Sequence, residues 1–341
     1  MKELSLPVQV VVRNYGDRVL TYAGGRTSQL ETKAVVQFDV GFVNVEYQRH
    51  VLNFLGPNGV LVGFLSVPIC GSDVSNILQG YKRERIGGNS GFDMEGSGVI
   101  NGHEALLVIL SKGKDVDGFE PGEIYMVQAD MRGFNGLQAV GYRVPGGFRG
   151  LGIYGPNVQK FLVKVHSPEE GERKVGLIEA SMIEGPACIY ASHKTGPIRG
   201  EDRTILINGG GGNMASLHLK EILYRLNQGE LTSLEIIYLA DIMDPGMDRA
   251  ISRFGHAFGR HDVELLKVNV KETELGSAID GKVDYYIETV KQFPELTLER
   301  CRTMLSENGM LMAYAGMARG EGPVILVDGT KYSIGDVHWD G

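Results

Sequence analysis

Apolar positions follow one pattern in the first half of the chain and another after about residue 175. In the first part, short runs rich in β-branched residues are separated by turn signals containing glycine and proline, a pattern typical of strands. These runs are Val8–Val12, Val60–Val67, Leu106–Leu110, Ile124–Gln128 and Phe161–Val165. The sequence therefore predicts a β-rich domain here, either a sandwich or a partial barrel.

The second part alternates strand-like runs with segments whose apolar residues have helical spacing. The expected strands are Ile205–Ile207, Glu235–Ala240, Val263–Val268, Val283–Ile287 and Met310–Ala315. The expected helices are Met214–Leu226, Met247–Phe258 and Leu296–Leu305, the last closed by Asn308-Gly309. Alternating strands and helices indicate an α/β domain with a parallel sheet and crossover helices.

The length of 341 residues exceeds what one typical core supports, so two domains are expected. The change of pattern places them at residues 1–178 and 179–341. The net charge of −8 argues against nucleic acid as a partner. No apolar run approaches the ~18 residues of a membrane span, and the amino terminus has no signal-peptide pattern. Three cysteines in so long a chain favour a reducing compartment, so we expect a cytoplasmic protein without a membrane partner.

Two short strings in the first domain carry candidate metal ligands. Cys70-Gly71-Ser72-Asp73 combines a thiol, a hydroxyl and a carboxyl group, and Gly102-His103-Glu104 joins an imidazole to a carboxyl group. Thiolate, imidazole and carboxylate are the ligand types of an open catalytic zinc site. Asp73 and Glu104 are suited to orienting the ligands, and Ser72 to bonding the substrate oxygen and taking its proton. Alternatively, Cys70 and His103 are structural residues, and Ser72 caps a helix at its amino end.

A glycine-rich turn after the Ile205–Ile207 strand predicts a dinucleotide site. It aligns as Gly210-x-Gly212-x-x-Ala215, where Gly210 makes the tight turn and Gly212 allows close approach of a pyrophosphate. Asn213, Met214 and Ala215 open the following helix, whose amino end favours phosphate. Asp241 ends the next strand, where a carboxylate binds the ribose hydroxyls of NAD and repels the extra phosphate of NADP. The alternative is a flexible loop.

With these residues in place, the chain resembles the medium-chain, zinc-type alcohol dehydrogenases from about Lys33 to His338, and its glycine turn most resembles the polyol and sugar-phosphate branch. The resemblance is carried by Ile69-Cys70-Gly71-Ser72-Asp73, Ile100-Asn101-Gly102-His103-Glu104, Phe119-Glu120-Pro121-Gly122-Glu123 and Glu184-Gly185-Pro186-Ala187-Cys188. It implies a GroES-like β-rich catalytic domain joined to a Rossmann domain.

The same resemblance carries expectations about individual residues. Glu184 matches a glutamate that lies at the zinc in polyol-type members, although a helix-surface carboxylate is an equal alternative. Residues 124–160 contain no cysteine, so the second, structural zinc of many members is not expected. Members are commonly dimers or tetramers, which makes a homo-oligomer the expectation. The chain stops where members usually continue for some tens of residues, so the carboxyl-terminal part of the Rossmann domain is expected to be missing.

The function expected from these observations is oxidation of a secondary alcohol or polyol, or of a sugar phosphate, by NAD at one catalytic zinc. Cys70, His103 and either Glu104 or Glu184 would hold the metal. Two alternatives stay open: a zinc-free reductase of the same superfamily, and a non-catalytic nucleotide-binding paralogue or fragment.

Overall fold

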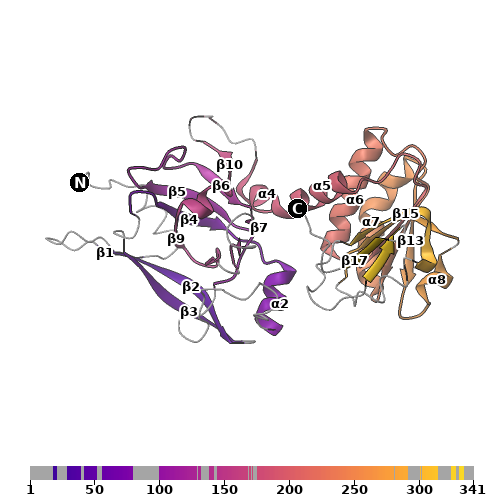
Figure 1. Cartoon of the computed structure of the whole chain (residues 1–341), viewed down its shortest axis with the longest axis horizontal. Coiled ribbons are helices and arrows are strands. Elements are labelled where there is room, and N and C mark those ends of the chain that lie inside the picture. Colours follow the sequence, from indigo (N-terminus) through magenta and orange to yellow (C-terminus); the bar gives the residue numbers. More distant parts are fainter. Residues whose placement is uncertain are drawn as a thin grey trace. The chain divides into compact units, whose positions relative to one another are not determined.

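The computed structural model of the chain describes residues 18–20, 29–39, 42–51, 56–79, 100–128, 130–131, 138–141, 144–167, 175–279, 281–290, 302–313, 324–327 and 330–333, with the single residues 169, 171 and 300. The chain divides into two compact units, Met1–Glu184 and Gly185–Gly341 (Figure 1). The expected Val8–Val12 strand lies outside the described residues. Among the described helices, none combines the length and apolarity needed to cross a membrane.

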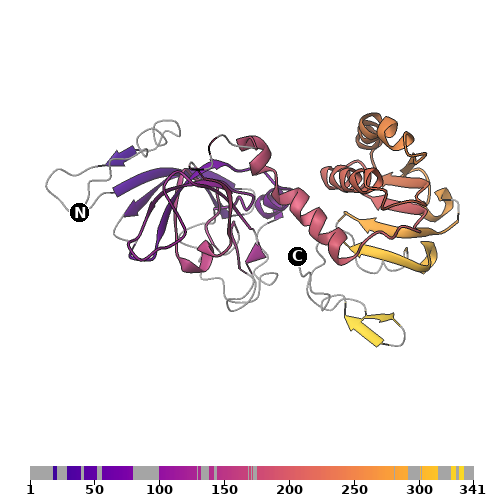
Figure 2. The same cartoon turned by 90° about the horizontal axis from the view of Figure 1, so that it is seen from above.

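The first unit is built on a five-stranded antiparallel sheet of order β10-β6-β5-β4-β9. Its strands are β4 (Val60–Ser66), β5 (Leu106–Lys112), β6 (Ile124–Val127), β9 (Leu151–Tyr154) and β10 (Leu162–His166). Four of these were expected from the sequence. Figure 2 shows the strands curving around a common interior, which is filled by buried side chains such as Val62, Leu107 and Tyr154.

The first unit contains further strands and helices outside this sheet. A second sheet has the order β1-β2-β3, and β7 pairs with β8. Their bounds are β1 (Arg18–Leu20), β2 (Gln29–Asp39), β3 (Phe42–Val51), β7 (Asp130–Met131) and β8 (Gln138–Ala139). The helices are α2 (Gly71–Gln79), α3 (Pro156–Gln159) and α4 (Leu177–Ser181). Helix α5 (Glu184–Thr195) begins at the last residue of this unit.

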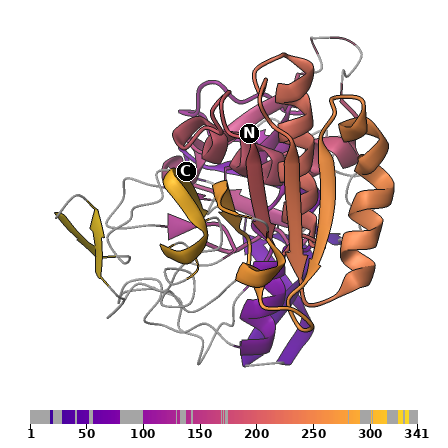
Figure 3. The same ribbon diagram turned by 90° about the vertical axis from the view of Figure 1, so that its right-hand side faces the viewer.

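The second unit contains the parallel sheet that the alternating pattern predicted, with the order β13-β12-β11-β14-β15 (Figure 3). Its strands are β11 (Thr204–Asn208), β12 (Ile236–Asp241), β13 (Glu264–Asn269), β14 (Val283–Glu288) and β15 (Leu305–Ala313). Its helices are α6 (Asn213–Asn227), α7 (Asp244–Gly259) and α8 (Leu275–Ala278). Strands β16 (Val324–Val327) and β17 (Thr330–Ser333) form a separate hairpin, yellow in Figure 2.

Successive side chains of the central strands alternate between the two faces of this sheet. Ile205 and Ile207 pack with Leu219 of α6 and Phe254 of α7 on one face. Leu206 packs on the other face in a cluster that includes Leu275 of α8. The chain therefore changes faces between β11 and β14, and ligands of open α/β sheets bind at the carboxyl ends of strands beside such a switch point.

The sequence prediction was wrong at the end of the Leu296–Leu305 helix. Residues 302–304 are helical, but strand β15 already begins at Leu305 and continues through Asn308 and Gly309. The pairing with β14 shifts here, because Val283 pairs with Leu305 and Tyr285 with Met310. The Asn-Gly pair thus lies in an irregularity of the strand, where glycine and asparagine are often found, instead of closing a helix.

Two buried histidines join α5 to α6. His193 Nε2 lies 2.9 Å from His218 Nδ1, and both side chains are buried. Burial lowers the pKa of His193 to about 4, with a further contribution from the charge of Arg225. Burial, and then the proximity of His193, lowers the pKa of His218 to about 3. Both imidazoles are therefore neutral in the folded protein near pH 7.

Acidification is therefore expected to destabilise the second unit through these histidines. A histidine in the unfolded chain titrates near pH 6.5. The stabilisation from the two neutral histidines is therefore complete above that pH, and it is lost as the pH falls toward their pKa values in the folded protein. The expected loss is roughly 3 kcal/mol for each histidine between pH 7 and 4. Urea unfolding of His218→Asn should show a weaker dependence on pH over this range than the parent chain. Equal dependence in both proteins would contradict this role for the pair.

Candidate metal and dinucleotide sites

Cys70 lies directly before the first residue of α2. Its backbone N–H donates to Asp73 Oδ2 at 3.0 Å, as in a helix cap where the third helical residue bonds back to the capping position. This bond fixes the start of the helix and, with it, the direction of the Cys70 side chain. The alternative prediction of Ser72 as the helix cap is wrong, because Ser72 lies inside the first turn of α2.

His103 is positioned by a tight turn before β5. Gly102 has φ +93, and a Cβ there would lie 2.8 Å from Phe148 and 2.9 Å from Val67, so the position requires glycine. The Gly102 N–H donates to Asp73 Oδ1 at 3.0 Å. His103 Nδ1 lies 3.4 Å from the same oxygen. Asp73 therefore binds the two strings together, although they are about thirty residues apart.

The hydrogen bonds to Asp73 keep it ionised. Burial acts to raise the pKa of this carboxyl group, but the bonds from His103, the Cys70 N–H and the Gly102 N–H outweigh it and hold the pKa below its usual value. An ionised Asp73 accepts the Nδ1 proton of His103, which leaves the Nε2 lone pair available. Carboxylates orient metal-binding histidines in this way.

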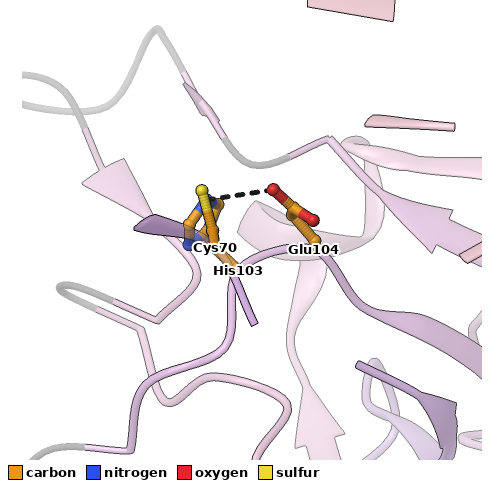
Figure 4. Close-up of side chains that lie close together, drawn as sticks. All are labelled: Cys70, His103 and Glu104. Carbon is orange, nitrogen blue, oxygen red and sulfur yellow. Dashed lines mark ion pairs between the residues drawn. The ribbon is translucent and has the colours of Figure 1, made fainter. Parts of the chain in front are cut away.

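Among the residues that the structure describes, Cys70, His103 and Glu104 form a set of potential metal ligands (Figure 4). Their ligand atoms all lie within 4.8 Å of one another, and His103 Nε2 lies 3.9 Å from Glu104 Oε1. Two ligands of a tetrahedral zinc, each about 2.0–2.3 Å from the ion, lie roughly 3.3–3.8 Å from each other, which is within this limit and close to the distance between His103 and Glu104. The donor types and their spacing fit a zinc ion with one position left for another ligand.

Negative groups crowd this cluster. Burial raises the pKa of Glu104, and the charges of Glu184 and Asp73 raise it further, while a hydrogen bond from Cys70 and the nearby His103 act in the opposite direction. Carboxylates forced together in a partly buried site are stabilised by a cation. The electrostatics therefore agree with the ligand geometry.

The remaining predicted residues of the first unit lie close to this cluster. The Ser72 hydroxyl is 3.4 Å from His103 Nε2, so it lies at the edge of the potential metal site. Glu184 is the first residue of α5 and is near enough for its charge to affect the Glu104 pKa. Glu184 is not a member of the three-ligand set.

The glycine turn of the second unit joins β11 to α6, as expected. The left-handed residue is Gly209, with φ +83, one position before the glycine to which the sequence alignment assigned the tight turn. Gly210 instead packs against β12, because a Cβ there would lie 2.8 Å from the Leu239 Cα atom. Gly211 packs against α7, where a Cβ would lie 2.9 Å from the Gly246 Cα atom.

The amino end of α6 is open to an anion. Gly212 occupies the capping position and has no side chain to bond the first N–H groups. Those groups belong to Asn213, Met214 and Ala215, and Ala215 is fully buried where the helix meets the sheet. An uncapped start of a 15-residue helix after a glycine turn has the form of a dinucleotide phosphate site. The residues present therefore fit the predicted cofactor.

Asp241 ends β12 beside this turn. One carboxylate oxygen accepts the Gly211 N–H at 3.0 Å, and the other accepts the N–H groups of Ile242 at 2.7 Å and Met243 at 3.3 Å. Backbone bonds thus hold the carboxylate in one orientation. Its remaining lone pairs can accept the hydroxyls of a ribose.

Sequence reasoning missed a second polar pair at the glycine turn. Asn208 ends β11 and Glu288 ends β14, and the two residues are partners in the parallel register. The Asn208 side chain donates to both carboxylate oxygens of Glu288 at 3.0 Å. A polar residue at the carboxyl end of each of two buried strands was the signal that could have revealed this pair.

The sequence matches no protein-family model and no curated protein. Solved structures do match. 2R,3R-Butanediol dehydrogenase from Bacillus subtilis superposes with a TM-score of 0.60 at 15% identity, over 84% of this chain and 79% of that one. L-Idonate 5-dehydrogenase from Escherichia coli gives 0.58 at 18% identity, over 88% and 80%. Galactitol-1-phosphate dehydrogenase from Escherichia coli gives 0.57 at 16% identity, over 84% and 78%.

These matches cover both units and confirm the resemblance seen in the sequence at the level of the fold. The antiparallel unit corresponds to a GroES-like domain and the parallel unit to a Rossmann domain. The chain thus has the two-domain fold of the zinc-type medium-chain dehydrogenases.

Proposed function

We propose that the protein is a zinc-dependent NAD(H) oxidoreductase that interconverts a secondary alcohol or polyol, including sugar phosphates, with its ketone. The observation that carries this proposal is the convergence of Cys70, His103 and Glu104 on one point in a fold shared with alcohol and polyol dehydrogenases. The glycine turn and Asp241 supply the second requirement, a dinucleotide site. The substrate is a small molecule, and we expect a cytoplasmic homo-oligomer.

Cys70, His103 and Glu104 would hold the metal. A bound zinc ion supplies Lewis acidity, which polarises the carbon–oxygen bond and lowers the pKa of a hydroxyl group. Asp73 keeps the Nδ1 proton of His103 in place, so that Nε2 faces the metal position. Ser72, whose hydroxyl is 3.4 Å from that nitrogen, would accept a hydrogen bond from the substrate hydroxyl and relay its proton by releasing its own hydroxyl proton to solvent.

In the second unit, the chain's task is to bind and orient the dinucleotide. The amino end of α6 would bind the pyrophosphate through the N–H groups of Asn213, Met214 and Ala215, next to Gly210 and Gly212 of the turn. Asp241 binds the ribose hydroxyls. A bound nicotinamide dinucleotide would supply hydride transfer to or from the substrate carbon.

The test is a dehydrogenase screen of the zinc-loaded protein over polyols, sugar phosphates and amino alcohols with NAD and NADP. NADH formation with at least one secondary alcohol supports the proposal. NADH binding without turnover across the whole panel would instead favour a non-catalytic nucleotide-binding protein. Turnover by protein that contains no zinc would favour the zinc-free reductase.

Glu104 and Glu184 can be distinguished as third ligands by matched substitutions. Glu104→Gln is expected to weaken zinc binding by about 100-fold, because it removes a charged ligand from the three-residue set. Glu184→Gln should weaken binding by less than about 10-fold, since that residue acts through its charge. Zinc affinity is measured by competition with a chelating dye. A larger loss in Glu184→Gln would make Glu184 the ligand and Glu104 its neighbour.

A further inference from the structure

A buried carboxylate lies at the end of β14, and the mechanism above does not use it. Glu288 is 1% exposed. Oε1 accepts the Val290 N–H at 2.9 Å, Oε2 accepts the Tyr286 hydroxyl at 2.8 Å, and both oxygens accept from the Asn208 side chain at 3.0 Å. Glu288 therefore serves as the common acceptor of three donors, two of which come from the ends of β11 and β14.

Asn208, which donates to Glu288, directly precedes the predicted phosphate-binding turn in the sequence. Its backbone oxygen accepts the N–H of Thr289 at 3.1 Å and the hydroxyl of Thr289 at 2.6 Å. The next residue is Gly209, the left-handed residue of the turn, whose Cα is packed against Thr289 and Val290 so closely that no Cβ fits. Glu288, the last residue of β14, and the two residues after it therefore hold the turn from one side.

The turn is held from the opposite side by β12. The Gly209 and Gly210 N–H groups donate to the Ala240 oxygen at 2.8 and 2.9 Å, and the Gly211 N–H donates to Asp241. Glu288 and Asp241 are therefore two carboxylates that fix one turn from its two neighbouring strands. Asp241 lies beside the expected ribose, whereas Glu288 is buried beneath the start of the turn.

We infer that Glu288 is a positioning residue for the dinucleotide: by holding Asn208, it sets the path of the Gly209–Gly212 turn and the direction of the N–H groups at the start of α6. The inference rests on the proposed function, since it needs a dinucleotide at that turn. It assigns Glu288 no contact with the cofactor. Its effect reaches the pyrophosphate through Asn208 and the backbone.

The donor pattern makes Glu288→Gln the informative substitution. The side-chain amide keeps an oxygen for the Val290 N–H, and its NH₂ group can donate to the Tyr286 oxygen. That NH₂ group, however, faces the NH₂ group of Asn208, so one bond becomes a repulsion between two donors. In the double variant Asn208→Asp/Glu288→Gln, the direction of the bond is reversed, and the pair has donor and acceptor again without a change of net charge.

Tyr286→Phe is the matched control. It also removes one hydrogen bond from Glu288 Oε2, so its effect on folding stability is comparable. Tyr286 donates to Glu288 Oε2 and not to Asn208, so its loss leaves both Asn208 bonds in place. A residue that acts on folding alone would give the same cofactor affinity in both variants.

The experiment is a titration of the folded proteins with NADH, followed by nicotinamide fluorescence, together with steady-state kinetics in NAD. Glu288→Gln is expected to raise the NADH Kd and the NAD KM about 10-fold, with kcat at saturating NAD changed by less than about twofold. In Tyr286→Phe, the NADH Kd and the NAD KM should stay within about twofold of the parent values. The double variant should recover at least about half of the loss in NADH affinity, measured on a logarithmic scale. If Glu288→Gln does not fold, Asn208→Ala breaks the same bond and should raise Kd similarly.

Two outcomes overturn the inference and are distinguishable from each other. If the parent chain binds NADH and Glu288→Gln (or Asn208→Ala) binds it equally well, or the double variant recovers nothing, Glu288 has no positioning role and the proposed function stands. If the parent chain binds neither NADH nor NADPH, the proposed function fails, and the role of Glu288 in cofactor binding fails with it.

Discussion

Cys70→Ala is expected to remove most of the bound zinc and to lower kcat/KM by at least about 1,000-fold. The thiolate is the strongest zinc ligand in the Cys70, His103 and Glu104 set, and two ligands do not hold the ion at ordinary concentrations. NADH affinity should change by less than about twofold, because the glycine turn and Asp241 belong to the other unit. Elemental analysis, turnover and NADH titration measure the three quantities.

Cys188→Ala is the matched control for this substitution. Cys188 is the other free cysteine among the residues that the structure describes, and it lies in α5. Its replacement should leave zinc content and turnover unchanged. Retention of zinc and activity in Cys70→Ala, or their loss in Cys188→Ala, would show that the metal site has been placed wrongly.

Asp241→Ala is expected to reduce the preference for NAD over NADP by about 100-fold. The substitution removes an acceptor for the ribose hydroxyls and a charge that repels the additional phosphate of NADP. It also breaks the bonds to the Gly211, Ile242 and Met243 N–H groups. The loss of these bonds weakens the binding of NAD and of NADP alike. The ratio of kcat/KM for NAD to kcat/KM for NADP is therefore the measurement that isolates the ribose interaction.

Asp244→Ala controls for the loss of a carboxylate at the same edge of the sheet. Asp244 opens α7 and bonds the side chain of Asn269 at 3.1 Å instead of the glycine turn. Its replacement should leave the cofactor ratio within about twofold of the parent value. A parent chain that already prefers NADP would disprove the role given to Asp241.

The second unit could be predicted from sequence because its elements have unambiguous patterns. Strands such as Ile205–Ile207 are short, continuous apolar runs, and helices such as Met247–Phe258 have apolar residues at helical spacing. Each lies within the corresponding element of the structure. The pattern failed at Asn308-Gly309, because the same two residues favour both a helix end and a strand irregularity, and only the pairing with β14 decides between them.

The ligand types at the metal site could be predicted, but their arrangement could not. The Cys70 and His103 strings have recognisable chemistry, whereas the contact between them depends on three bonds to Asp73 and on the close packing of Gly102. Gly209 was overlooked as the tight-turn residue because four consecutive glycines offer several alignments. The Asn208–Glu288 pair joins residues eighty positions apart through the sheet register, which no local pattern encodes.

The most direct measurement of the central claim is a zinc titration of chelator-stripped protein, with NADH formation followed at saturating NAD and an alcohol found in the screen. A single open site of Cys70, His103 and Glu104 predicts no turnover without metal and a linear rise that ends at about one zinc per chain. Full turnover in stripped protein, or a rise that continues to about two zinc ions per chain, would contradict the account.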